Sequence, residues 1–157
     1  MNVNIEFNYR GMVRLLTVVV SVIMVLYHMW AIGFGSPEAI WFRGTHLLFA
    51  MVLTFLIFRV TGQGEGAPSV ADYVLLVLGV VPILYLFINY DYIVNRIFYV
   101  DDLTVMDKIM GVMMTLVLLE AVRRVLGWAM PITAFAFLFY GLFIARLEPQ
   151  RLLDQLY

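Results

Sequence analysis

A run of 23 residues, from Leu15 to Pro37, contains no Asp, Glu, Lys or Arg. As an α-helix it would extend about 35 Å, which is enough to cross the hydrocarbon core of a bilayer. Charged side chains are also missing from four further blocks, at 44–58, 73–90, 109–119 and 125–145. Backbone polar groups in lipid must satisfy one another, so such blocks form helices. The sequence therefore predicts an all-α, polytopic integral membrane protein.

We expect one membrane domain, residues 1–157, with four to five transmembrane helices. The predicted hydrophobic helices cover about 14–34, 42–60, 71–90, 104–126 and 128–145. The helix at 104–126 has an uncharged centre of about 11 residues, so it would be a short span with its charged ends reaching the interface. Residues 1–14 form a polar lead-in, and no cleavage site follows the first span, which we interpret as uncleaved.

Turn and cap signals separate these helices. Glycine, serine and proline at 33–37 are typical of a helix stop. Ser69-x-x-Asp72 and Thr104-x-x-Asp107 both match the N-terminal capping box. Pro82 lies inside the third helix and is expected to kink it. Aromatic and polar residues interleave at 91–100, which predicts a short interfacial arm, with a surface loop as the alternative.

Composition excludes several classes of protein. Charged residues make up 13% of the chain, about half the share usual in soluble domains. The net charge of −1 and the absence of basic runs argue against a nucleic-acid partner. There is no cysteine for thiolate metal sites or disulfides. The longest stretch between spans, 91–108, is too short for an independent soluble domain.

No pattern points to an enzyme. The chain has no credible Ser/His/Asp grouping, and its glycines at 62–66 precede no phosphate-binding Lys-Ser or Lys-Thr pair. We assign no catalytic, substrate-binding or metal-binding residue and no cofactor. Orientation also stays open, because five basic residues fall on each side of a five-span arrangement.

Two histidines are candidates for a different chemistry. His28 lies late in the first predicted span and His46 lies early in the second, so an antiparallel pair would bring both to one membrane face. Two such histidines could bind a haem, as in membrane anchors of respiratory enzymes. The simpler interpretation is that each hydrogen-bonds a neighbour near the headgroups.

A charged cluster lies near the C-terminal end of the fourth predicted helix. Glu120 precedes Arg123 and Arg124 by three and four residues, spacings that bring side chains together on a helix. The simpler interpretation is a neutralised helix end. The alternative is a docking point for a partner subunit or for lipid phosphate, to which arginine is well suited.

The same segment, Leu118-Leu-Glu-Ala-Val-Arg-Arg-Val-Leu-Gly-Trp-Ala-Met-Pro-Ile132, resembles the small membrane component of tripartite ATP-independent periplasmic (TRAP) transporters of the TAXI type. Residues 89–111 and the ending at 151–157 resemble the family more weakly, and 1–88 share only its hydropathy. The sequence departs from the pattern at Val122 and Met130, where Thr and Leu are common in the family.

The resemblance implies a small scaffold subunit of a secondary-active importer of organic anions, typically carboxylates or dicarboxylates, driven by ion symport. Its implied partners are a large membrane transport subunit, here expected as a separate chain, and a periplasmic substrate-binding protein. The implied location is the bacterial inner membrane. In this family the substrate and sodium sites lie on the large subunit, so no such site is assigned to this chain.

The interface residues that we predict, for a subunit or for lipid, form the corner between the fourth and fifth helices: Glu120, Arg123, Arg124, Gly127, Trp128 and Pro131. Two alternatives to the transporter subunit remain. One is a haem- or quinone-associated membrane anchor of a respiratory enzyme. The other is a stand-alone channel, which is disfavoured because no predicted span presents a polar face.

Overall fold

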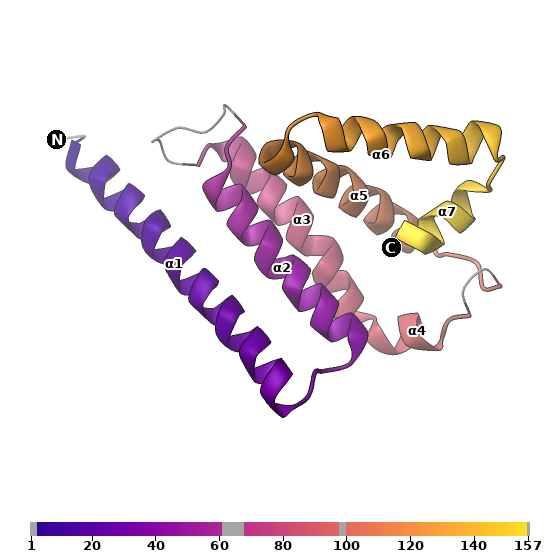
Figure 1. Ribbon diagram of the computed structural model, residues 1–157, viewed down its shortest axis with the longest axis horizontal. Helices are drawn as coiled ribbons and strands as arrows, with labels where there is room; N and C mark the ends of the chain where they lie inside the picture. The colour runs from indigo at the N-terminus through magenta and orange to yellow at the C-terminus, as the bar shows by residue number, and fades with distance from the viewer. Residues whose placement is uncertain (1–2, 61–67, 98–99, 157) are drawn as a thin grey trace. The chain divides into compact units, whose positions relative to one another are not determined.

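The computed structural model describes residues 3–60, 68–97 and 100–156. Every regular element in these ranges is a helix (Figure 1), as the hydropathy pattern predicts. The chain forms two compact units, one up to Val77 and one from Leu78 onward. The third helix begins in the first unit and ends in the second, and the two units are described separately below.

The first unit is built on a helical hairpin. Helix α1 covers Val3–Phe34 and helix α2 covers Ala39–Ile57, and the two helices pack on each other. The Tyr27 ring lies 6.0 Å from the ring of Phe42 and 6.2 Å from that of Phe49, between ring centroids. The carboxylate of Glu38 caps α2 by accepting a hydrogen bond from the Ile40 amide at 3.0 Å. The glycine-rich turn therefore brings two apolar helices side by side.

The first helix begins earlier than the predicted limit of about residue 14 and includes most of the polar lead-in. Helix α1 begins at Val3 and continues without a break into the apolar span. The reason is local, because residues 3–13 contain no proline, and the single glycine, Gly11, is tolerated within a helix. The polar side chains before residue 14 mark the limit of the predicted membrane span, but α1 continues through them.

The predicted capping box before the third helix is confirmed. Helix α3 covers Val70–Ile88. The Asp72 carboxylate accepts from the Ser69 amide at 2.7 Å and from the Ser69 hydroxyl at 2.8 Å. Its other oxygen accepts from the Val60 amide at 3.1 Å, just after α2. Asp72 is almost fully buried, so one carboxylate caps α3 and ties its start to the end of α2.

The second unit starts in the C-terminal half of α3. It then contains α4 (Tyr90–Asn95), α5 (Val105–Leu126), α6 (Ala129–Phe139), the π-helical turn η1 (Tyr140–Ile144) and α7 (Pro149–Leu156). Helix α6 packs along α5, and α7 folds back to contact α5 (Figure 1). The Thr104 and Asp107 capping box that opens α5 is confirmed. The predicted arm at 91–100 begins with α4, and residues 98–99 lie outside the described residues.

The helix predicted at 128–145 is two elements rather than one. Helix α6 passes at Tyr140 into η1, where the Ala145 amide donates to the Tyr140 carbonyl, five residues back, at 2.9 Å. Arg146 then adopts a left-handed φ of 52°, which ends the helix. Gly141 is buried in η1 with Leu147 and Leu152 against it. The wider π-helical turn therefore forms at a small residue, Gly141, against which the chain packs as it folds back.

Three helices among the described residues are long and apolar enough to cross a membrane: Arg10–Phe34, Ala39–Ile57 and Val70–Ile88. Pro82 lies inside the third of these, as predicted. Helix α5 differs from them because its 22 residues include five charged side chains. Residues Ala129–Ile144 form a shorter apolar helix. The chain is therefore an all-helical protein of membrane type.

Candidate functional site

Of the six residues predicted at the corner between α5 and α6, five are linked by hydrogen bonds or ring contacts, and Pro131 is buried in the first turn of α6. We call Glu120, Arg123, Arg124, Gly127, Trp128 and Pro131 the α5–α6 corner. Glu120 accepts from Arg123 Nε at 2.7 Å and from Arg123 Nη2 at 2.8 Å, a two-point ion pair. Arg124 Nε donates at 2.8 Å to Glu120 Oε1, the oxygen that also accepts from Arg123 Nη2. The cluster holds one negative and two positive charges, so it carries a net charge of about +1.

The turn of the corner depends on Gly127. Its amide closes the last turn of α5 by donating to the Arg123 carbonyl at 2.9 Å. Its φ of 80° with ψ of −169° is a backbone region open essentially to glycine alone. The chain then places Trp128 so that its ring lies 5.1 Å from Arg123 Cζ, a cation–π contact. Pro131 is buried in the first turn of α6, where proline needs no amide partner.

Chemically, the corner is suited to binding rather than catalysis. Both oxygens of Glu120 are held by guanidinium groups, and an engaged carboxylate of this kind is a poor general base. Arg123 keeps a quarter of its side-chain surface exposed, while Arg124 is almost fully buried. The exposed positive group is therefore Arg123, stacked on Trp128.

A second polar cluster, around Asp107, was only partly visible in the sequence. Beyond its capping role, the buried Asp107 carboxylate accepts from the hydroxyl of Tyr85 at 2.7 Å and from that of Tyr92 at 3.0 Å. The Thr104 amide and hydroxyl donate to it at 2.9 and 2.6 Å. We call these four residues the Asp107 cluster. It joins the end of α3, α4 and the start of α5 through one carboxylate.

The sequence contained one signal for this cluster. Tyr85 and Tyr92 are seven residues apart, which is about two helical turns and places them on the same side of a nearly continuous helix. Partial burial and the hydrogen bond to Asp107 raise the pKa of Tyr92 above its usual value of 10.0. The phenol is therefore held in its neutral, donating form.

The two histidines meet, as the antiparallel arrangement predicts. His28 Nδ1 lies 2.6 Å from the Met24 carbonyl oxygen, so this nitrogen carries the proton. His28 Nε2 then accepts from His46 Nδ1 at 3.0 Å. The rings stand nearly perpendicular, at 83°, with centroids 5.0 Å apart. The pair links α1 to α2 at the end of the hairpin near the turn.

This pairing does not fit two axial ligands of one haem iron. Two imidazole nitrogens on opposite sides of a metal are about 4 Å apart, twice a metal–nitrogen bond of about 2 Å. The two nitrogens here are 3.0 Å apart and share a proton. The arrangement instead matches the simpler interpretation, in which each histidine hydrogen-bonds a neighbour. Among the described residues no group of three or more His, Cys, Asp or Glu side chains could hold a metal ion.

Comparisons with protein-family models, with curated proteins and with solved structures find no match for this chain.

Proposed function

We propose that this chain is the small scaffold subunit of a TRAP transporter of the TAXI type. Such an importer takes up organic anions, typically carboxylates, by ion symport and uses a periplasmic binding protein. The proposal starts from the resemblance of residues 118–132 to that family. In this role the chain braces a large transport subunit, a separate polypeptide in the bacterial inner membrane, and does not itself bind substrate.

The observation that carries the proposal is the amount of apolar surface that the long helices leave exposed. Only 6% of the apolar window of α1 is buried. Leu15, Leu26 and Met29 each expose 60% or more of their surface. In α3, Val74 and Val77 are about half exposed. A bilayer together with a large apolar partner would cover such surfaces, as a scaffold subunit requires.

The membrane arrangement that we propose has four to five spans. Helices α1, α2 and α3 form three of them. Helix α5 adds a short fourth span, with Asp107 near one membrane surface and the α5–α6 corner near the other. Residues 129–144 form a fifth span or a shorter re-entrant helix. Helix α4 and the residues after it then form the interfacial arm, in which Val94 and Ile97 are exposed toward the headgroups.

The first test is purification of the tagged chain from its native membrane in mild detergent, followed by mass spectrometry and an absorbance scan. We expect a large polytopic membrane protein in about equal amount, with no visible chromophore. A Soret band, or a soluble oxidoreductase in place of the large subunit, would overturn the proposal in favour of the respiratory anchor. Gradient-driven uptake of carboxylates with the binding protein present would then test the transport itself.

A second test asks whether the α5–α6 corner holds the partner. We expect Arg123→Ala combined with Arg124→Ala to lower recovery of the large subunit with the tagged chain. The matched control is Arg151→Ala, which removes an arginine that is 61% exposed and pairs with Glu148 over 3.3 Å. Unchanged recovery in the double variant would remove the corner from the proposed subunit interface.

A further inference from the structure

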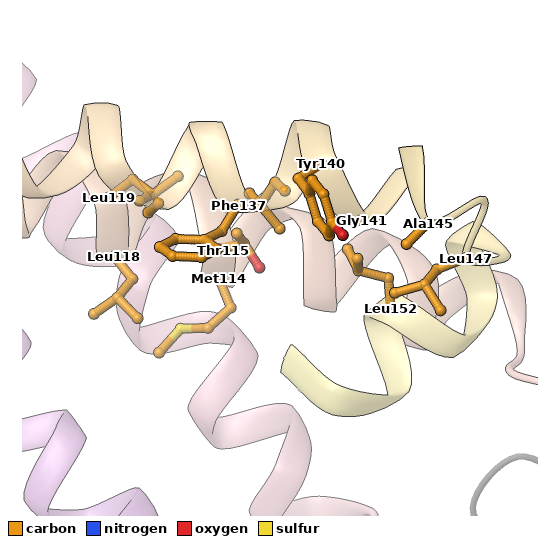
Figure 2. A pocket seen from close by; sticks show the side chains of 12 residues that line it. Met114, Thr115, Leu118, Leu119, Phe137, Tyr140, Gly141, Ala145, Leu147 and Leu152 are labelled. Atoms are coloured by element: carbon orange, nitrogen blue, oxygen red, sulfur yellow. The ribbon is translucent and has the colours of Figure 1, made fainter. Parts of the chain in front are cut away.

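The second unit contains an apolar pocket that the proposed function does not use. It has a volume of about 540 Å³ and lies between α5, α6 with η1, and α7 (Figure 2). This volume is in the range of small-molecule sites, about 300–1,000 Å³. The hydroxyl of Thr115, one of its few polar groups, already donates to the Gly111 carbonyl at 2.8 Å. The pocket is therefore suited to an apolar ligand.

The lining combines three elements. Figure 2 shows Leu118 and Leu119 at one end of the pocket, and Leu147 and Leu152 at the other. Leu152 belongs to α7, so the C-terminal helix contributes to the lining at the second end. One turn of a helix that is about 10–12 Å across occupies roughly 400–600 Å³. A volume of about 540 Å³ is therefore small for a partner helix and suited to part of a single acyl chain.

The end of the pocket that Leu118 and Leu119 line lies toward the α5–α6 corner along α5. Arg123 follows Leu119 by four residues, so the two side chains lie on the same face of α5, about 6 Å apart along the helix. With Glu120 and Arg124 the corner carries a net charge of about +1. Arg123 is the arginine of the pair that retains exposed surface. A positive group is thus placed one helical turn from an apolar pocket.

Trp128 indicates the depth of this positive group in the membrane. Its ring is 62% exposed and lies against the Arg123 guanidinium. Tryptophan concentrates at the membrane–water interface, at the level of the headgroups. An arginine at that depth is placed to meet phosphate, and on a helix that crosses the bilayer the Leu119 end of the pocket would lie one turn deeper.

We propose that the α5–α6 corner and this pocket together bind one anionic phospholipid. Its phosphate is held by Arg123, and part of one acyl chain occupies the pocket. This inference relies on the α5–α6 hairpin lying in the bilayer, and it does not depend on the transporter assignment. The charge of the corner favours an anionic headgroup, and the volume of the pocket favours part of an acyl chain over a helix.

The test is native mass spectrometry of the full chain, delipidated in detergent and titrated with defined lipids. Phosphatidylglycerol and phosphatidylcholine with identical acyl chains differ in net headgroup charge. Both lipids carry a phosphate that Arg123 can hold, but the choline ammonium of phosphatidylcholine offsets that charge and faces a corner of net charge about +1. We therefore expect the anionic lipid to bind about tenfold more tightly. Inorganic phosphate at the same concentration should not displace it, because phosphate lacks the acyl chain.

Variants separate the headgroup from the chain. Arg123→Gln should lower phosphatidylglycerol binding about tenfold. It should lower phosphatidylcholine binding by less, because removing the positive charge also relieves its repulsion of the choline ammonium. Glu120→Gln should have the opposite effect, because it raises the net charge of the corner from about +1 to about +2. Ala134→Phe, which places a ring in the pocket lining, should weaken both lipids. Ala136→Phe is its control, on an exposed position of α6 outside the lining.

Several results would overturn the lipid site. These are equal binding of the two lipids, displacement by inorganic phosphate, or wild-type binding in both Arg123→Gln and Ala134→Phe. If Arg123→Gln does not fold, Glu120→Gln decides, because a purely structural ion pair predicts no gain in anionic lipid when the acid is removed. Lipid binding is measured on the isolated chain. A failure of the lipid prediction therefore does not test the proposed subunit role, and a failure of the subunit role does not change the lipid result.

Discussion

His28 Nε2 accepts a hydrogen bond from His46 Nδ1 over 3.0 Å, and this contact links α1 to α2 near the turn of their hairpin. Around it, the Tyr27 and Phe42 rings lie 5.4 Å from the His28 ring, between centroids. The histidines therefore act as a polar contact within an aromatic cluster.

His46→Ala should destabilise the hairpin by about 1 kcal/mol, the usual net value of one hydrogen bond. His46→Gln should lose less, because its amide can still donate to His28. Thermal unfolding in detergent, followed by circular dichroism, measures both variants. Equal losses in the two variants would show that packing of the ring matters and the hydrogen bond does not.

Asp107→Ala should be among the most destabilising single changes in the second unit. It removes the cap of α5 and leaves the donors of Tyr85, Tyr92 and Thr104 without their acceptor. We expect a loss of more than about 3 kcal/mol. Asp107→Asn should fall between this variant and wild type, and Asp91→Asn is the control on an exposed acid of α4. Denaturant titration in detergent gives the values, and an equal effect of Asp107→Ala and Asp91→Asn would contradict the cluster's role.

The Asp107 cluster also predicts a dependence on alkaline pH. The pKa of Tyr92 is raised above 10.0 by partial burial and by its bond to Asp107. A raised pKa means that the stabilisation is fully present below about pH 10 and is lost as the pH rises through the folded-state value. Wild type should therefore be more stable than Tyr92→Phe at pH 8, and the difference should shrink toward pH 11. Melting temperatures of both proteins across that range provide the measurement, and a constant difference would rule out titration of Tyr92 as its origin.

Gly127→Ala should destabilise the α5–α6 corner although the structure leaves open space for a methyl group there. The cost arises from the backbone, because φ of 80° with ψ of −169° is unfavourable for alanine by about 1–3 kcal/mol. Gly33→Ala is the matched control, since Gly33 is helical and also has open space around it. That variant should be neutral or slightly stabilising. A melting temperature for Gly127→Ala at or above that of wild type would contradict the backbone argument.

Much of the fold could be predicted because bilayer physics leaves few choices. An uncharged run long enough to cross lipid must be a helix, and α2 and α3 lie within about three residues of their predicted limits. Both capping boxes were visible because the cap requires specific side chains at a fixed spacing. The start of α1 could not be predicted in this way, because hydropathy reports where a span ends and a helix can continue past it into water.

The hydrogen bonds and packing contacts between segments distant in the sequence depended on the tertiary structure. Glu120, Arg123 and Arg124 could be grouped from their spacing alone, since a helix brings neighbours three and four apart together. The two tyrosines on Asp107 could not, because the chain after α4 must return before the start of α5 brings Asp107 to both of them. The π-helical turn at 140–144 likewise forms where Leu147 and Leu152 pack against Gly141. No local sequence pattern predicts this contact.

The sequence by itself determined the membrane character of the chain, its helices, their caps and the charged corner, because each follows from local hydropathy or from a fixed helical spacing. The tertiary structure decided which polar groups share a partner: two histidines with each other, two tyrosines with one aspartate, and an arginine with a tryptophan. It also decided that α7 helps to line an apolar pocket, one end of which lies a helical turn from that arginine. Those contacts depend on how distant segments pack, and packing is set by the shapes of side chains in three dimensions rather than by their order along the chain.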